Sequence, residues 1–255
     1  MTVICEGKTE RSYLKRANDE AGQESRFVIH LEPHRQPSKG FKPSDAVERA
    51  REVQRRIADG SMEDGQDREG EEGRDGQGGD AGAGTDRPEE HVWVVFDRDQ
   101  NRDIPRAMGD ANRHGINVAF STPSFDLWLW LHFAPGQPAL MSDDNEQIVR
   151  KLNGVENFGR YGRSSGGRDS DSRPKVLNDS QFRDLWSNRR RAVTLARKLV
   201  DGCSSGRCKA SSKKGKSGHA ENCDPLRRDT QTDFYLLLEL LGVDDQPGAG
   251  SSRRS

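Results

Sequence analysis

Two acidic side chains follow directly after a short apolar segment. Residues 92–96 (VWVVF) suit a buried strand, and Asp97 and Asp99 come immediately behind them. Side chains at i and i+2 of an extended segment point to the same side, so the two carboxylates can act together. Such a pair serves either in turn and cap chemistry or in a site for a hard metal ion, and the pair alone does not decide between these roles.

A third acid, Glu6, ends another strand-like segment at residues 2–6 (TVICE). In a doubly wound sheet with strand order 2-1-3-4, ligands bind at the carboxyl ends of the strands, between the first and the third. Glu6 would meet Asp97 and Asp99 there, and such crowding is unfavourable unless a cation offsets it. Mg²⁺ or Mn²⁺ binds oxygen ligands, and ions of this kind activate water and stabilise the leaving oxygen of a phosphodiester.

The surrounding pattern alternates strands with helices. Apolar, β-prone segments predict strands at 2–6, 27–31, 91–96 and 116–120. Apolar residues at helical spacing predict helices at 10–21, 44–57, 104–113, 125–133, 181–199 and 233–241. This alternation indicates an α/β fold with a doubly wound parallel sheet of about four strands and a C-terminal helical extension.

Three motifs in this order resemble the RloB-like family of Toprim-fold nucleases. They are CEGKTE at 5–10, FDRD at 96–99 and STPSFDLWLWLHF at 121–133. The resemblance covers most of the chain outside residues 60–90 and 202–218. It implies a Toprim-like fold, a metal site at Glu6, Asp97 and Asp99 with Glu10 nearby, and a role in restriction loci and phage defence.

Two further positions of the expected catalytic group have alternative roles. Asp126 stands where the family usually has Glu, and the shorter side chain needs closer placement to take a direct part. At the start of a helix it can instead stabilise the helix dipole. Lys8 can neutralise a scissile phosphate or remain a solvated charge of its loop.

A second set of metal-ligating types lies near the C-terminus. Cys203, Cys208, His219 and Cys223 can supply four zinc ligands. Their spacing is irregular and the loop around them is rich in Gly, Ser and Lys, so a loop without metal is the favoured interpretation. Four cysteines in a chain of 255 residues do not indicate a disulfide framework.

The charge of the chain is unevenly distributed. The formal net charge is -1, yet residues 155–228 hold 18 Lys/Arg against 8 Asp/Glu. Arg189, Arg190 and Arg191 are expected to contact the phosphates of a nucleic acid, whether DNA or RNA, without reading its sequence. The alternative is that they are ordinary solvated charges on a helix.

Composition divides the chain into parts. Residues 60–90 are rich in Gly, Asp, Glu and Arg and cannot bury enough surface to offset ordering entropy, which predicts a disordered insertion in a catalytic domain of residues 1–135. A basic, mainly helical extension at 136–245 and a disordered tail at 246–255 follow. No apolar segment approaches the length of a membrane span, so we expect a cytoplasmic protein without membrane contact.

The sequence therefore favours a Mg²⁺-dependent nuclease acting in phage defence or abortive infection, with a defence-system protein as a possible partner. The alternative is a non-catalytic scaffold that binds nucleic acid or a nucleotide and recruits a partner effector. A primase-like enzyme is a weaker third hypothesis. Salt-dependent binding without turnover would distinguish the scaffold from the nuclease.

Overall fold

Strand β1 (Thr2–Cys5) lies at the interior of a mixed sheet, between parallel neighbours β2 (His30–Glu32) and β3 (Val92–Asp97). Strand β4 (Asn117–Thr122) runs parallel to β3, and the short β5 (Gln231–Thr232) pairs antiparallel with β4. The order is β2-β1-β3-β4-β5. The predicted α/β fold and strand order are confirmed, and β5 is added at one edge.

The computed structural model describes most of the chain. The described residues are 1–22, 25, 27–33, 41–60, 91–98, 101–136, 144–159, 161, 176–213 and 215–242. Asp99, residues 61–90 of the insertion predicted at 60–90 and the predicted tail 246–255 lie outside them. Within the described part, no helix is both long enough and apolar enough to cross a bilayer.

Both faces of the sheet are buried, because successive apolar side chains of its central strands point to opposite faces. Val3 and Cys5 of β1 belong to one hydrophobic cluster, and Ile4 between them belongs to the other. Strand β3 behaves likewise, with Trp93 facing the first cluster and Val94 the second. The central strands β1 and β3 are therefore apolar along nearly all of their length, as two-sided burial requires.

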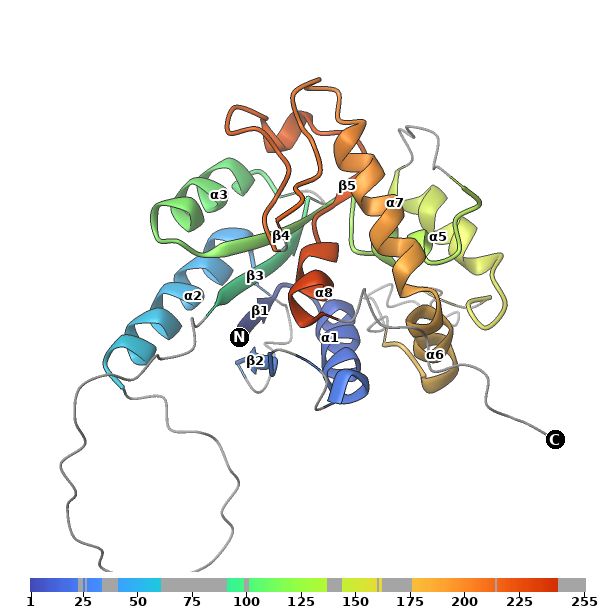
Figure 1. The fold of residues 1–255 in the computed structure, drawn as a ribbon, viewed down its shortest axis with the longest axis horizontal. Coiled ribbons are helices and arrows are strands. Elements are labelled where there is room, and N and C mark those ends of the chain that lie inside the picture. The colour runs from blue at the N-terminus through green and yellow to red at the C-terminus, as the bar shows by residue number, and fades with distance from the viewer. Residues whose placement is uncertain are drawn as a thin grey trace, which may run out of the picture.

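Helices cover each face, as Figure 1 shows. The second cluster is covered by α2 (Pro43–Ala58) and α3 (Ile104–Arg113). The first is covered by α1 (Lys8–Ala21), α4 (Asp126–Leu131), α5 (Asn145–Asn153), α6 (Asp179–Ser187), α7 (Arg189–Asp201) and α8 (Tyr235–Leu241). These are the eight α-helices of the described residues.

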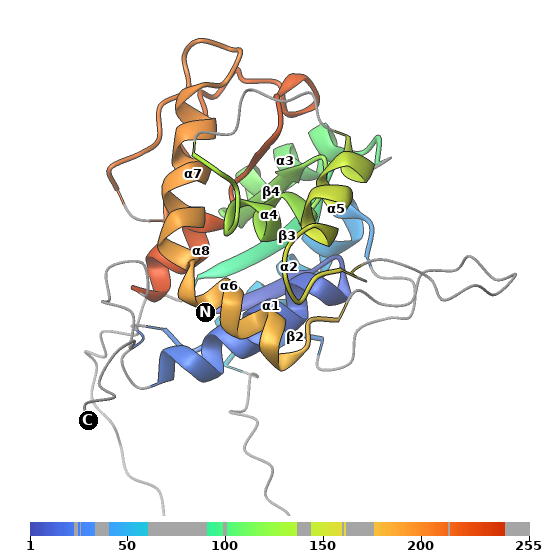
Figure 2. The same cartoon turned by 90° about the vertical axis from the view of Figure 1, so that its right-hand side faces the viewer.

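Aromatic side chains join the N-terminal and C-terminal parts in one core. The Tyr13 ring of α1 lies edge-on to Phe182 of α6 at 5.6 Å and to Phe234 at 5.5 Å, measured between centroids. Figure 2 shows α6 lying beside α1, and α7 following α6 towards α8. The C-terminal helices thus pack directly on the sheet domain.

Some predicted boundaries differ from the structure. The helix predicted at 181–199 is two helices, because the chain turns at Asn188, where the amide side chain donates to the Asp184 carbonyl. Helix α6 begins with a capping box between Asn178 and Gln181. Helix α5 was not predicted, and Asp144 caps it by accepting from the Gln147 amide at 2.9 Å.

Candidate functional site

The first acids of the candidate site meet where β1 and β3 end. Glu6 follows β1, and its backbone amide donates to the Val95 carbonyl at 2.9 Å, which continues the pairing of the two strands. Its carboxylate accepts from the Asp97 amide through Oε2 at 2.9 Å and from the Asn101 side-chain amide through Oε1 at 3.1 Å. Glu6 is therefore held in place against the end of β3.

Two more acids come from the first turns of helices. Glu10 of α1 is 4% exposed, and its carboxylate lies against the backbone of Gly7, where an added Cβ would be 2.3 Å from Oε2. Gly7 therefore allows the close approach of this side chain. Asp126 begins α4, is 3% exposed and accepts a hydrogen bond from the Tyr161 hydroxyl at 2.7 Å.

We call the four acids Glu6, Glu10, Asp97 and Asp126 the acidic site. Within it, the Asp97 carboxylate is repelled by the charges of the other three. Its Oδ2 accepts from the Phe125 amide at 2.9 Å, while the buried Oδ1 has no hydrogen-bond partner among the described residues. Burial raises the pKa of Asp97 well above its ordinary value, and the neighbouring carboxylates of Glu10, Glu6 and Asp126 act in the same direction. A positive charge placed beside Oδ1 would relieve this repulsion.

The donor chemistry of the acidic site is of the kind that suits a hard divalent cation such as Mg²⁺. Its donors are carboxylate oxygens, the ligands that Mg²⁺ prefers. A buried carboxylate oxygen without a hydrogen bond is costly on its own and is an available ligand. Each oxygen of Glu6 accepts a hydrogen bond, Oε2 from the Asp97 amide and Oε1 from the Asn101 side chain.

The predicted basic residues occupy different environments. Lys8, the first residue of α1, is exposed and lies two residues after Glu6 in the sequence. Arg190 is exposed on α7, whereas Arg191 donates through Nε to the Ala134 carbonyl at 2.9 Å. Arg189 is 5% exposed and lies over the Trp186 ring at 4.8 Å. Packed on Trp186, Arg189 is less accessible to a nucleic acid than Arg190, and the expected phosphate contact by these arginines stays a prediction.

A second group lies in the segment between α7 and β5. Of the described residues, one group has ligand atoms that all lie within 4.8 Å of one another, namely Cys203, Cys208, His219 and Cys223. These residues form a candidate metal site with the donor types that zinc binds. The sequence interpretation favoured a loop without metal, and the convergence of these four side chains gives the metal more support than their spacing did.

Three residues near these groups were missed by sequence reasoning. Asn101 and Tyr161 hold the carboxylates of Glu6 and Asp126, and Asp233 lies 3.6 Å from His219 Nε2. Burial, followed by the Asp126 charge, raises the pKa of Tyr161, so its hydroxyl remains a donor. Tyr161 is, with Phe158, one of two aromatic residues in the Gly, Ser and Arg-rich stretch of residues 154–176, which was the one available signal.

Comparison with known proteins gives one match. A family model described as RloB-like protein matches residues 1–241. No curated protein and no solved structure gives a significant match to the chain. The matched range includes both the acidic site and the Cys–His group.

Proposed function

The chain belongs to the RloB-like family, and on that premise we propose that it is a Mg²⁺-dependent nuclease that hydrolyses phosphodiester bonds of DNA or RNA in phage defence. The observation that carries the proposal is the Asp97 carboxylate. It is held at the carboxyl end of a central strand, among three other acids, with one buried oxygen left without a hydrogen bond among the described residues.

Glu6, Glu10 and Asp97 are the described residues that would hold the ion, and Asp99 is the further ligand expected from the sequence. When bound, Mg²⁺ supplies the positive charge that offsets the negative charge developing on the phosphate oxygens. Mn²⁺, which has similar ligand preferences, is the natural substitute.

The protein's own amides and side chains hold the carboxylates in position. The Asp97 amide and Asn101 orient Glu6, and the Phe125 amide orients Asp97, so two of the carboxylates are fixed before substrate binds. Such fixed geometry lowers the cost of reaching the reactive arrangement. Lys8 is exposed beside the site and can contact a substrate phosphate, and Asp126, anchored by Tyr161, adds negative charge at its border.

The test compares the wild type with two variants on plasmid DNA and total RNA. Asp97→Ala removes the central carboxylate, and Asp19→Ala removes an exposed carboxylate of α1 as a matched control. We expect Mg²⁺-dependent cleavage by the wild type and Asp19→Ala, and its loss in Asp97→Ala or with EDTA. Cleavage that survives in Asp97→Ala would refute the site.

The proposed role in phage defence is tested by counting plaques. Expression of the wild type in a phage-sensitive host should lower plaque formation, and Asp97→Ala should restore it. Salt-dependent binding of nucleic acid with no cleavage of either substrate would instead support the scaffold hypothesis, in which the protein recruits a partner effector.

A further inference from the structure

We propose that Cys203, Cys208, His219 and Cys223 bind one Zn²⁺ ion in a closed structural site, and that this ion fixes the segment 202–228 to the edge of the sheet at β5. The site is separate from the acidic site in its residues, its donor chemistry and its position in the chain. The proposal therefore stands or falls independently of nuclease activity.

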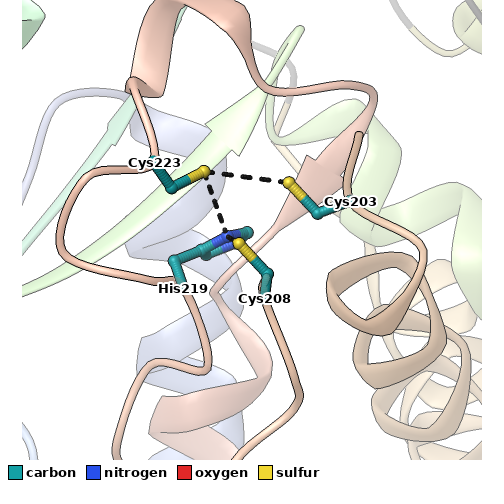
Figure 3. A group of neighbouring side chains, drawn as sticks. All are labelled: Cys203, Cys208, His219 and Cys223. Carbon is teal, nitrogen blue, oxygen red and sulfur yellow. Dashed lines mark hydrogen bonds between the residues drawn. The ribbon is translucent and has the colours of Figure 1, made fainter. Parts of the chain in front are cut away.

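The distances between the four side chains suit a tetrahedral ion. Cys203 Sγ and Cys223 Sγ are 3.8 Å apart, and His219 Nδ1 lies 3.2 Å from Cys208 Sγ and 3.8 Å from Cys223 Sγ. A tetrahedron with Zn–S distances of about 2.3 Å has S···S edges of about 3.8 Å, and its N···S edges are slightly shorter. Figure 3 shows the three thiols and the imidazole converging on a common point.

A disulfide does not explain this arrangement. The Sγ atoms of Cys203 and Cys223 are well beyond the roughly 2.0 Å of an S–S bond, and none of the four cysteines, all of them in the described part of the chain, forms a disulfide. A disulfide would also leave Cys208 and His219 without a role. A metal uses all four side chains at once.

The backbone brings the ligands together from two sides. The Lys209 amide donates to the Gly218 carbonyl at 2.9 Å, which places the neighbouring residues Cys208 and His219 opposite each other. The approach is so close that a Cβ on Gly218 would lie 2.1 Å from the Lys209 carbonyl oxygen. Glycine at 218 is therefore a requirement of this crossing.

The segment contains little else that would order it. Its regular structure is a single 3-10 turn, η2 (Pro225–Arg227), and its sequence is rich in Gly, Ser and Lys. Its three cysteines are each 7% exposed or less, so the thiols are among the most buried side chains it contributes. In small polar segments of this kind, metal binding supplies the folding free energy that an apolar core would otherwise provide.

Asp233 links the proposed ion to the sheet. His219 presents Nδ1 to the thiols, and its Nε2 lies 3.6 Å from Asp233 Oδ1, just beyond hydrogen-bond distance. Neither atom has a hydrogen-bond partner among the described residues, and a small approach would form the carboxylate–imidazole bond that orients a metal-bound histidine. Asp233 directly follows β5, and its amide donates to the Phe120 carbonyl of β4 at 2.8 Å. Next to it, the Thr232 and Ser121 hydroxyls are hydrogen-bonded at 2.9 Å. Four protein ligands leave no open position, which indicates a structural rather than a catalytic ion.

The direct test is the metal content of the full-length protein, purified from zinc-supplemented cells. We expect one Zn²⁺ per chain in the wild type and in Cys5→Ala, the matched control that removes the cysteine outside the group. Cys208→Ala should lose at least nine-tenths of the zinc. Replacement by Co²⁺ should give the visible absorption of a tetrahedral thiolate site in the wild type and not in Cys208→Ala.

Two measurements protect the test against a variant that fails to fold. Titration of wild-type thiols with an organomercurial should release zinc in step with the modification of three cysteines. Asp233→Asn should lose zinc to a chelator about 10 to 100 times faster than Glu221→Gln, a charge-matched change in the same segment. Wild-type protein that contains no zinc and binds no Co²⁺, or a Cys208→Ala protein that keeps its zinc, would overturn the proposal.

Discussion

The Asp97 amide donates a hydrogen bond to the Glu6 carboxylate at 2.9 Å, although 91 residues separate the two in the sequence. The register of the sheet causes this contact, because Cys5 pairs with Val95. Glu6 directly follows Cys5, and Asp97 lies two residues after Val95, so the two acids end adjacent strands. Two acids of the candidate site are thus positioned by adjacent parallel strands and not by flexible loops.

The first prediction concerns how far the crowding of carboxylates around Asp97 lowers the stability of the fold. Asp97→Asn keeps an oxygen that can accept from the Phe125 amide and removes the charge that Glu10, Glu6 and Asp126 repel. Without metal, we expect the variant to unfold at a higher temperature than the wild type, since each 1 kcal/mol of relieved repulsion raises Tm by about 2–4 °C. Differential scanning calorimetry in EDTA measures this.

Added Mg²⁺ should reverse the order. An ion that binds only the folded state raises Tm in proportion to its occupancy, so the wild type should gain stability and Asp97→Asn should gain little. Asp19→Asn, on the exposed side of α1, should follow the wild type in both buffers. An Asp97→Asn variant less stable than the wild type in EDTA would show that repulsion among these carboxylates does not destabilise the fold.

The acids of the strands could be predicted because their positions depend on simple periodicities. Continuous apolar segments fix β1 and β3, and the doubly wound order places their carboxyl ends side by side, which brings Glu6 to Asp97. The family motifs added Glu10, whose burial against Gly7 depends on the absence of a side chain there. Hydrophobic periodicity does not indicate such a close approach of a side chain to the backbone.

Long-range partners could not be predicted for the same reason. Tyr161 reaches Asp126 across 35 residues from a segment with no apolar pattern, and β5 is two residues long, too short to show alternation. The Cys–His group could not be recognised from its spacing in the sequence. The chain crosses itself at Lys209 and Gly218, and this crossing brings together ligands whose sequence separations are irregular.

The second prediction separates two buried tyrosines. Tyr161→Phe deletes the hydroxyl that donates to Asp126 at 2.7 Å and leaves that buried carboxylate with a lost hydrogen bond. We expect a loss of about 1–3 kcal/mol in the free energy of unfolding, measured by urea titration. Tyr235→Phe is the matched control, because the Tyr235 hydroxyl has no hydrogen-bond partner in the described part of the chain. Equal losses in the two variants would contradict the role given to Tyr161.

The third prediction divides neighbouring arginines of α7 by their exposure. Arg190→Ala should weaken binding of a labelled oligonucleotide and lower the slope of log Kd against log salt by about 1, with stability unchanged. Arg189→Ala should instead cost about 1–2 kcal/mol of stability, because Arg189 lies over Trp186 and donates to its carbonyl at 2.9 Å. A salt slope that Arg190→Ala leaves unchanged would remove Arg190 from the predicted interface.

The last prediction rests on His132, which is 1% exposed in the aromatic core. Its Nδ1 donates to the Trp128 carbonyl at 2.8 Å, and its Nε2 accepts from the Tyr13 hydroxyl at 3.3 Å. Both ring nitrogens are thus engaged in the neutral form. His132 therefore serves the packing of α4 on α1, and adding a proton would leave a charge without solvent.

Burial lowers the pKa of His132 to about 3, whereas in the unfolded chain it is about 6.5. As the pH falls below 6.5 the unfolded chain takes up a proton first, so the stability present above that pH is lost progressively down to pH 3. In His132→Asn, whose amide can still donate to Trp128, unfolding free energy at pH 7 should be lower. Its decline from pH 7 to 4.5 should be smaller than that of the wild type by about 2 kcal/mol, by urea titration. Exposed His114→Asn should decline like the wild type, and parallel curves for all three proteins would show that His132 is not the titrating group.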